Sequence, residues 1–173
     1  GGFNSSIRFI GADTKDVPRV AYEIDPKDLD DFDDNVGYLH VKNLSDEWEV
    51  IEFPKNRKDH PAMSPIGFNL NNDVYYFASN HDLDHNGTMG LFALDLKTKD
   101  IKFLFRHPDV DINRALRGRE GEVIGVVYEA GYPGYYYLNT PEAQEEVQLH
   151  KQLRASFKGQ EVIIGNYTKD RSK

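Results

Sequence analysis

Cysteine is absent from the 173-residue sequence, which also contains only two methionines and one tryptophan. Without cysteine the chain can form no disulfide, no thiolate metal site and no cysteine nucleophile. The sequence also lacks any apolar run near the ~20 residues that a membrane-spanning helix needs, and no signal peptide is visible. We therefore expect no membrane partner. A cysteine-free chain suits reducing and oxidising compartments alike, and a cytoplasmic location is slightly favoured.

Positive charge is in the minority. Lys and Arg number 21 against 29 Asp and Glu, which gives a formal net charge of −8 at pH 7. Because an acidic surface repels phosphate backbones, we expect no nucleic-acid partner. The densest acidic stretch, residues 25–35, carries six aspartates. Such a block could attract calcium or a basic partner, but a charge run of this kind is usually a solvated loop.

Aromatic residues, in contrast, are plentiful, and they gather in short apolar runs. In Gly90–Pro108 two such runs flank the polar stretch Lys97–Asp100, a pattern that predicts a β-hairpin. The same pattern occurs 53 residues earlier, in Gly37–Phe53, where Trp48 aligns with Ile101. A fixed offset that preserves strand, turn and strand indicates a structural repeat.

The rest of the chain also favours strands. Further apolar runs of strand length are Ile7–Ile10, Val20–Ile24, Ile66–Leu70, Val74–Ala78, Val123–Tyr128, Tyr135–Leu138 and Val162–Ile164. The dipeptide Pro133-Gly134 predicts a turn, because proline presets one backbone angle and glycine accepts a positive one. The polar stretch Asp109–Gly121 is interpreted as a connector between strands.

One helix is predicted, over Pro141–Lys158. Thr140 offers a capping hydroxyl, proline stands at the first helical position, and Gly159 supplies a stop. Five apolar residues fall on one predicted helical face: Ala143, Val147, Leu149, Leu153 and Phe157.

These elements predict a mostly β fold made of antiparallel β-propeller blades, with one helix near the C-terminus. The alternative is an antiparallel β-sandwich built from the same hairpins. We place the whole chain, 1–173, in one partial propeller domain. Its repeat units are about 36–54, 66–108 and 110–158, and 159–173 begins a further blade. Because incomplete blades leave unpaired strand edges, we expect the chain to belong to a longer protein or to self-associate through those edges.

Several short stretches resemble the prolyl oligopeptidase family of serine peptidases. They are the hairpin end His107–Asp111 (HPDVD), the strand end Val127–Glu129, and the helix, glycine turn and strand that lead to Asp170. The similarity is closest to the propeller domains of acylaminoacyl-peptidase and dipeptidyl-aminopeptidase-like members, and it covers mainly the second half of the chain.

The resemblance implies a non-catalytic role. In that family the propeller covers a separate α/β-hydrolase domain and filters peptide substrates by size, while the catalytic serine belongs to the hydrolase domain. No G-x-S-x-G motif occurs in this sequence. The chain alone is therefore expected to be inert. Its expected partners are the hydrolase domain of the same protein and, through it, peptide substrates, and no cofactor is expected. The alternative is a stand-alone scaffold that binds a partner protein.

The loop His81–Gly87 is the sharpest local cluster. It matches the opening of a calcium-binding loop, but the glutamate needed at the twelfth position is replaced by Ala93. Two histidines and two aspartates could instead hold a transition metal. These weak candidates are His81, Asp82, Asp84 and His85. The plainer interpretation, a polar loop between two strands, is preferred, and no metal is expected.

Other candidates rest on single features. Arg114, Arg117 and Arg119 could bind a carboxylate such as a peptide C-terminus. They could equally form a solvated connector or pair with aspartates elsewhere in the chain. Ser79, close to His81 and Asp82, suggests a triad, but neighbouring loop residues seldom hold that geometry. A further group of aromatic residues resembles a binding platform, although strand alternation indicates ordinary packing. It comprises Tyr132, Tyr135, Tyr136 and Tyr137.

Overall fold

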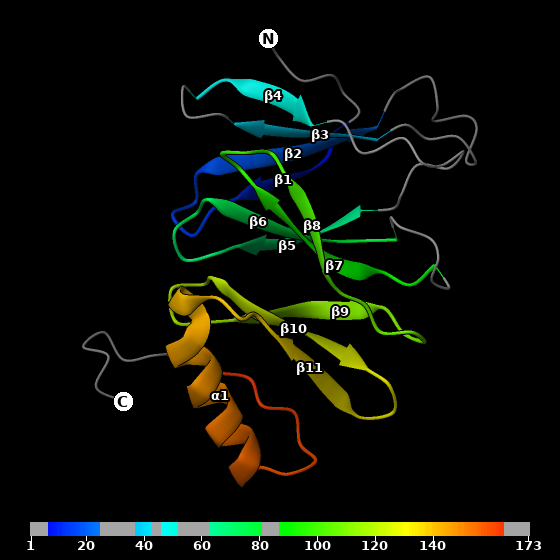
Figure 1. The fold of residues 1–173 in the computed structure, drawn as a ribbon, viewed down its shortest axis with the longest axis vertical. Helices are drawn as coiled ribbons and strands as arrows, with labels where there is room; N and C mark the ends of the chain where they lie inside the picture. The colour runs from blue at the N-terminus through cyan, green and yellow to red at the C-terminus, as the bar shows by residue number, and fades with distance from the viewer. Residues whose placement is uncertain (1–6, 25–36, 43–45, 52–62, 81–86, 165–173) are drawn as a thin grey trace.

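The computed structural model describes residues 7–24, 37–42, 46–51, 63–80 and 87–164, which form three antiparallel sheets and one α-helix (Figure 1). The first sheet has the strands β1 (Ile7–Ala12), β2 (Pro18–Ile24), β3 (Gly37–Lys42) and β4 (Trp48–Ile51). The second has β5 (Met63–Phe68), β6 (Val74–Ser79), β7 (Gly90–Asp95) and β8 (Ile101–Phe105). The third has β9 (Ile112–Arg117), β10 (Val123–Glu129) and β11 (Pro133–Tyr137). A short 3-10 turn, η2 (Pro141–Ala143), leads into α1 (Gln144–Ser156).

Every strand pairs with its neighbour along the chain, so each sheet is a simple antiparallel meander. The predicted hairpins are confirmed, and so is their offset, because β3 begins at Gly37 and β7 at Gly90. The turn that ends each of these strands repeats as well. Asp46 and Lys99, which lie 53 residues apart, both have a positive φ, of 63° and 65°. The repeat seen in the sequence is therefore a repeat of backbone conformation.

The second sheet is buried on both faces. Along β6, Tyr75 and Phe77 pack in one hydrophobic cluster with the first sheet, whereas Tyr76 and Ala78 pack in another with the third sheet. Strand β7 continues the alternation. Because successive side chains of a strand point to opposite faces, a strand buried on both sides is apolar at every position. The first five residues of β6, VYYFA, have this composition, and the strand ends at the buried polar residue Ser79.

The three sheets are stacked in series, as the blue, green and yellow layers of Figure 1 show. The first strand of the second sheet, β5, contacts the first strands of both other sheets, β1 and β9. Propeller blades gather their first strands around a common axis in this way. In a two-layer sandwich, by contrast, each sheet buries only one face. The mostly β, antiparallel fold with one C-terminal helix is confirmed, and the stacked sheets are consistent with a partial propeller or with a sandwich.

Several strand boundaries differ from the prediction, among them those of β5 and β11, and one strand was missed. The stretch interpreted as a connector contains β9, whose Ile112 and Leu116 are buried against the third sheet's core. Strand β5 begins before Ile66 and includes Pro65, which an edge strand tolerates because one side of it needs no N–H donor. The predicted Pro-Gly turn lies earlier, at Gly131 (φ 85°), and Pro133 already belongs to β11.

The C-terminal part also departs from the prediction. Val162–Ile164 forms no strand within the described residues. The helix is present, but Thr140 makes no capping hydrogen bond through its side chain. Its buried face is turned relative to the predicted one, since it contains Glu146 and His150, whereas Phe157 is 51% exposed. No helix in the described part of the chain is long and apolar enough to cross a membrane.

The aromatic residues of β11 alternate as predicted. Tyr136 stacks on Phe105 of the second sheet, with ring centroids 4.6 Å apart. Tyr135 and Tyr137 stack on each other at 6.1 Å on the opposite face, where both rings also contact His150 of α1. The helix therefore covers the face of the third sheet that points away from the second sheet.

Candidate functional site

The three arginines proposed from the sequence are engaged by the chain's own groups. Arg114 pairs with Glu161, and Arg119 pairs with Glu145 and Glu146 of α1. Arg117 donates to two backbone carbonyl oxygens, those of Ile66 and Gly121, each at 2.8 Å. Burial lowers the pKa of Arg117. These arginines therefore link neighbouring segments, and their partners are glutamates and backbone carbonyl oxygens rather than the aspartates considered from the sequence.

The other sequence candidates give no described site. Ser79 is fully buried in β6, where a substrate carbonyl could not reach its hydroxyl. The weak metal candidates lie outside the described residues; they are His81, Asp82, Asp84 and His85. The aspartate run at 25–35 also lies outside the described residues. Within the part of the chain that the structure describes, no group of three His, Cys, Asp or Glu residues could hold a metal ion.

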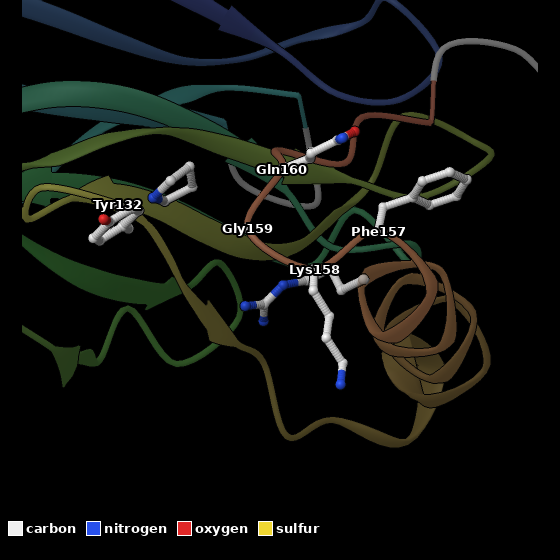
Figure 2. A pocket seen from close by; sticks show the side chains of 7 residues that line it. Tyr132, Phe157, Lys158, Gly159 and Gln160 are labelled. Atoms are coloured by element: carbon white, nitrogen blue, oxygen red, sulfur yellow. The ribbon is translucent and has the colours of Figure 1, made fainter.

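A different feature, a cavity of about 290 Å³, lies between the end of α1 and the turn that joins β10 to β11. It is lined by Tyr132, Pro133, Arg154, Phe157, Lys158, Gly159 and Gln160. Figure 2 shows Tyr132 and Phe157 on opposite sides, with the turn at Gly159 between them. Tyr132 is 79% exposed and Phe157 is 51% exposed, so the cavity opens to solvent between two aromatic side chains.

Cations of α1 pack on the rings of β11 beside this cavity. The guanidinium carbon of Arg154 lies 4.1 Å from the ring centroid of Tyr135, and the ammonium of Lys151 lies 5.0 Å from that of Tyr137. Both distances are within the range of a cation–π contact. Lys158, in the turn that follows α1, also lines the cavity. Helical spacing on α1 and two-residue spacing on β11 thus bring a row of cations against a row of rings.

The segment after the helix (157–164, the C-terminal segment) is fixed by side chains. The amide of Val162 donates to the Tyr135 hydroxyl at 3.3 Å, and its carbonyl oxygen accepts from His150 Nε2 at 2.9 Å. Glu161 is held by Arg114 of β9. These contacts explain why Val162–Ile164 does not form the predicted strand, since the backbone groups of Val162 already bond to side chains.

The contacts of His150 define its tautomer. Nε2 faces a carbonyl oxygen, which can only accept, so Nε2 carries the hydrogen and Nδ1 accepts from the Tyr137 hydroxyl at 2.9 Å. The same Tyr137 oxygen accepts from Arg154 at 3.3 Å. Burial of the ring lowers the pKa of His150, and the nearby charge of Arg154 lowers it further, although the bond to Val162 acts in the opposite direction. The imidazole is therefore held neutral.

Acidification is expected to destabilise the protein through His150. Because its pKa is lower when folded, the unfolded chain binds the proton first, and stability falls as the pH drops below the ordinary histidine pKa of about 6.5. Urea unfolding of the parent protein and of His150→Gln between pH 7 and pH 5 measures this difference. Tyr137→Phe is the control, because it removes a bond but keeps the buried imidazole. If the free energy of unfolding changed equally with pH in the parent and in His150→Gln, the lowered pKa of His150 would not be the cause of the acid destabilisation.

The cavity could not be located from the sequence, but part of it was visible there. Lys151, Arg154 and Lys158 have helical spacing, and Tyr135 and Tyr137 alternate on a strand. Neither pattern indicates that the two rows face each other, because that depends on how the helix packs on the sheet.

Comparisons with known proteins found no matching family model, no matching curated protein and no matching solved structure.

Proposed function

We propose that this chain is a non-catalytic propeller segment of a prolyl-oligopeptidase-like serine peptidase, in which it controls the access of peptides to an α/β-hydrolase domain. The proposal starts from the resemblance of the hairpin end His107–Asp111 and of Val127–Glu129 to that family. In such an enzyme the hydrolase domain performs the peptide hydrolysis and the propeller selects what reaches it.

The observation that carries this proposal is the serial stacking of meander sheets with β1, β5 and β9 gathered together. In a propeller the innermost strands of the blades surround a central channel, and β1, β5 and β9 would take that position here. The absence of a nucleophile elbow supports a non-catalytic role, as does the burial of Ser79.

A second candidate function, a stand-alone propeller-like scaffold that binds a partner protein, is favoured by one specific observation. Helix α1 occupies the face of the third sheet on which a further blade would stack, through His150 and its contacts with Tyr135 and Tyr137. A ring that continued past this sheet would have to displace the helix. The scaffold needs no such rearrangement.

A serine-reactive probe distinguishes the two. An antibody raised against this chain is used to isolate the native protein from its source, and the isolate is treated with a fluorescent fluorophosphonate. We expect labelling of a single polypeptide longer than 173 residues, because the hydrolase domain of the same protein carries an activated serine. The isolated chain is the control and should remain unlabelled, since it has no nucleophile elbow. An unlabelled native protein would overturn the peptidase proposal and support the scaffold.

A further inference from the structure

We propose that the cavity at the end of α1 is a binding site for the carboxylate of a peptide, with Arg154 and Lys158 as its cationic groups. This inference is independent of the proposed function, because it depends only on the cavity and its lining. A peptide is recognised there by one negative charge and an adjacent apolar or aromatic group.

The cavity is positively charged in an otherwise acidic molecule. Two of its lining residues, Arg154 and Lys158, are cations, and neither pairs with a carboxylate among the residues that the structure describes. The carboxylate that follows the lining directly in the sequence, Glu161, is held by Arg114 on β9. The net charge of the chain is −8, so this spot differs in sign from the molecule as a whole. A single anionic group is the ligand that this arrangement attracts.

Arg154 is held in place before any ligand arrives. Its guanidinium lies on the ring of Tyr135 at 4.1 Å, and one of its nitrogens donates to the Tyr137 hydroxyl at 3.3 Å. A guanidinium has five N–H groups in a planar fork, so the remaining donors can serve a carboxylate in a bidentate manner. Because the side chain is already ordered, less conformational entropy is lost on binding.

The floor of the cavity is also fixed. Gly159 has a φ of 76°, a conformation that glycine adopts without strain, and the turn closes with a hydrogen bond from the Gln160 amide to the Phe157 carbonyl at 3.2 Å. Beyond the turn, Val162 is tied to Tyr135 and His150. The turn that lines the cavity therefore has a defined backbone conformation, although the cavity itself opens to solvent.

Size and side chains favour a peptide terminus over other anions. A volume of about 290 Å³ is at the lower end for small-molecule pockets, which suits one amino-acid residue. The two exposed aromatic residues at its borders, Tyr132 and Phe157, offer apolar contact to a side chain next to the carboxylate. An inorganic anion could pair with the two cations but would make no apolar contact with these rings.

The test is an NMR titration of the full chain, with acetyl-alanyl-phenylalanine as the probe and its C-terminal amide as the matched ligand. We expect saturable shifts at the amides of Tyr132, Gly159 and Gln160 with the free carboxylate, at a Kd of about 1 mM or below, and none with the amide. Shifts of the same size with both ligands would overturn the proposal. So would saturation by inorganic phosphate without any response to the peptide.

Two variants and one control locate the site. Lys158→Gln removes an exposed charge from the lining and should raise the Kd about fivefold. Arg154→Lys keeps the charge but removes the planar fork, and should raise the Kd about tenfold. Lys151→Gln is the control, because it removes the same charge from a nearby position on α1 that does not line the cavity, and it should leave the Kd unchanged. If the control weakened binding as much as Lys158→Gln, the effect would be general electrostatics and the site would be rejected.

Discussion

Replacing Leu94 by alanine is expected to lower the free energy of unfolding by about 2–5 kcal/mol, because the change removes three carbon atoms from a closed core. Leu94 has no exposed surface and packs between the first and second sheets, with Leu39 and Phe77 in the same cluster. Urea unfolding followed by circular dichroism measures the change. We expect the midpoint to fall with little change in the slope.

Two further variants, with smaller expected losses of stability, serve as comparisons for Leu94→Ala. Leu104→Ala should cost less, because Leu104 is only partly buried at the border of the other cluster. Thr98→Ala, in the exposed turn between β7 and β8, should stay within about 0.5 kcal/mol. If all three variants unfolded at the same urea concentration, the two sheets would not share the core described above.

Replacing Gly125 by alanine is expected to destabilise the protein by about 1–3 kcal/mol through overpacking. A Cβ atom at this position in β10 would lie 2.3 Å from the carbonyl oxygen of Tyr136, a backbone atom that cannot move aside alone. Strands β10 and β11 would therefore have to separate locally. Hydrogen exchange of the Leu138 amide, which donates to the Ile124 carbonyl at 2.9 Å, reports that separation.

The wild-type exchange rate at Leu138 together with unchanged stability would show that the third sheet accommodates the methyl group, and the close approach of the two strands would then be unimportant. Faster exchange at Leu138 with normal exchange in β6 would place the effect in the third sheet, as expected.

Local patterns predicted the hairpins well, because alternation and turn residues are properties of neighbouring positions. The repeated hairpins that begin with β3 and β7 could be recognised from the sequence for this reason. Strand β9 could not be recognised, since three arginines and an asparagine in or near it resemble a solvated loop. In the fold Arg114 and Arg117 have partners on other elements, Glu161 and the carbonyl of Ile66, which no local pattern contains.

The candidate site was less accessible to sequence analysis than the fold. The arginine group was identified as a possible ligand site, yet it joins elements of the chain. The cavity instead uses Arg154, whose position depends on α1 packing against Tyr135. The helical face was predicted with the wrong phase, because His150 and Glu146 are buried through specific polar partners that hydrophobic periodicity cannot register.

The position of α1 limits how copies of this molecule can add to one another. A series of stacked sheets has two end faces, and an uncovered apolar end face can recruit another copy. At the third sheet the helix presents exposed polar residues such as Glu145 and Gln148 to solvent. At the first sheet Ile10 and Val50 lie in one row across the strands and are 54% and 49% exposed. If copies associate through the face that carries Ile10 and Val50, each copy uses that face once, so the contact joins two copies as a symmetric pair.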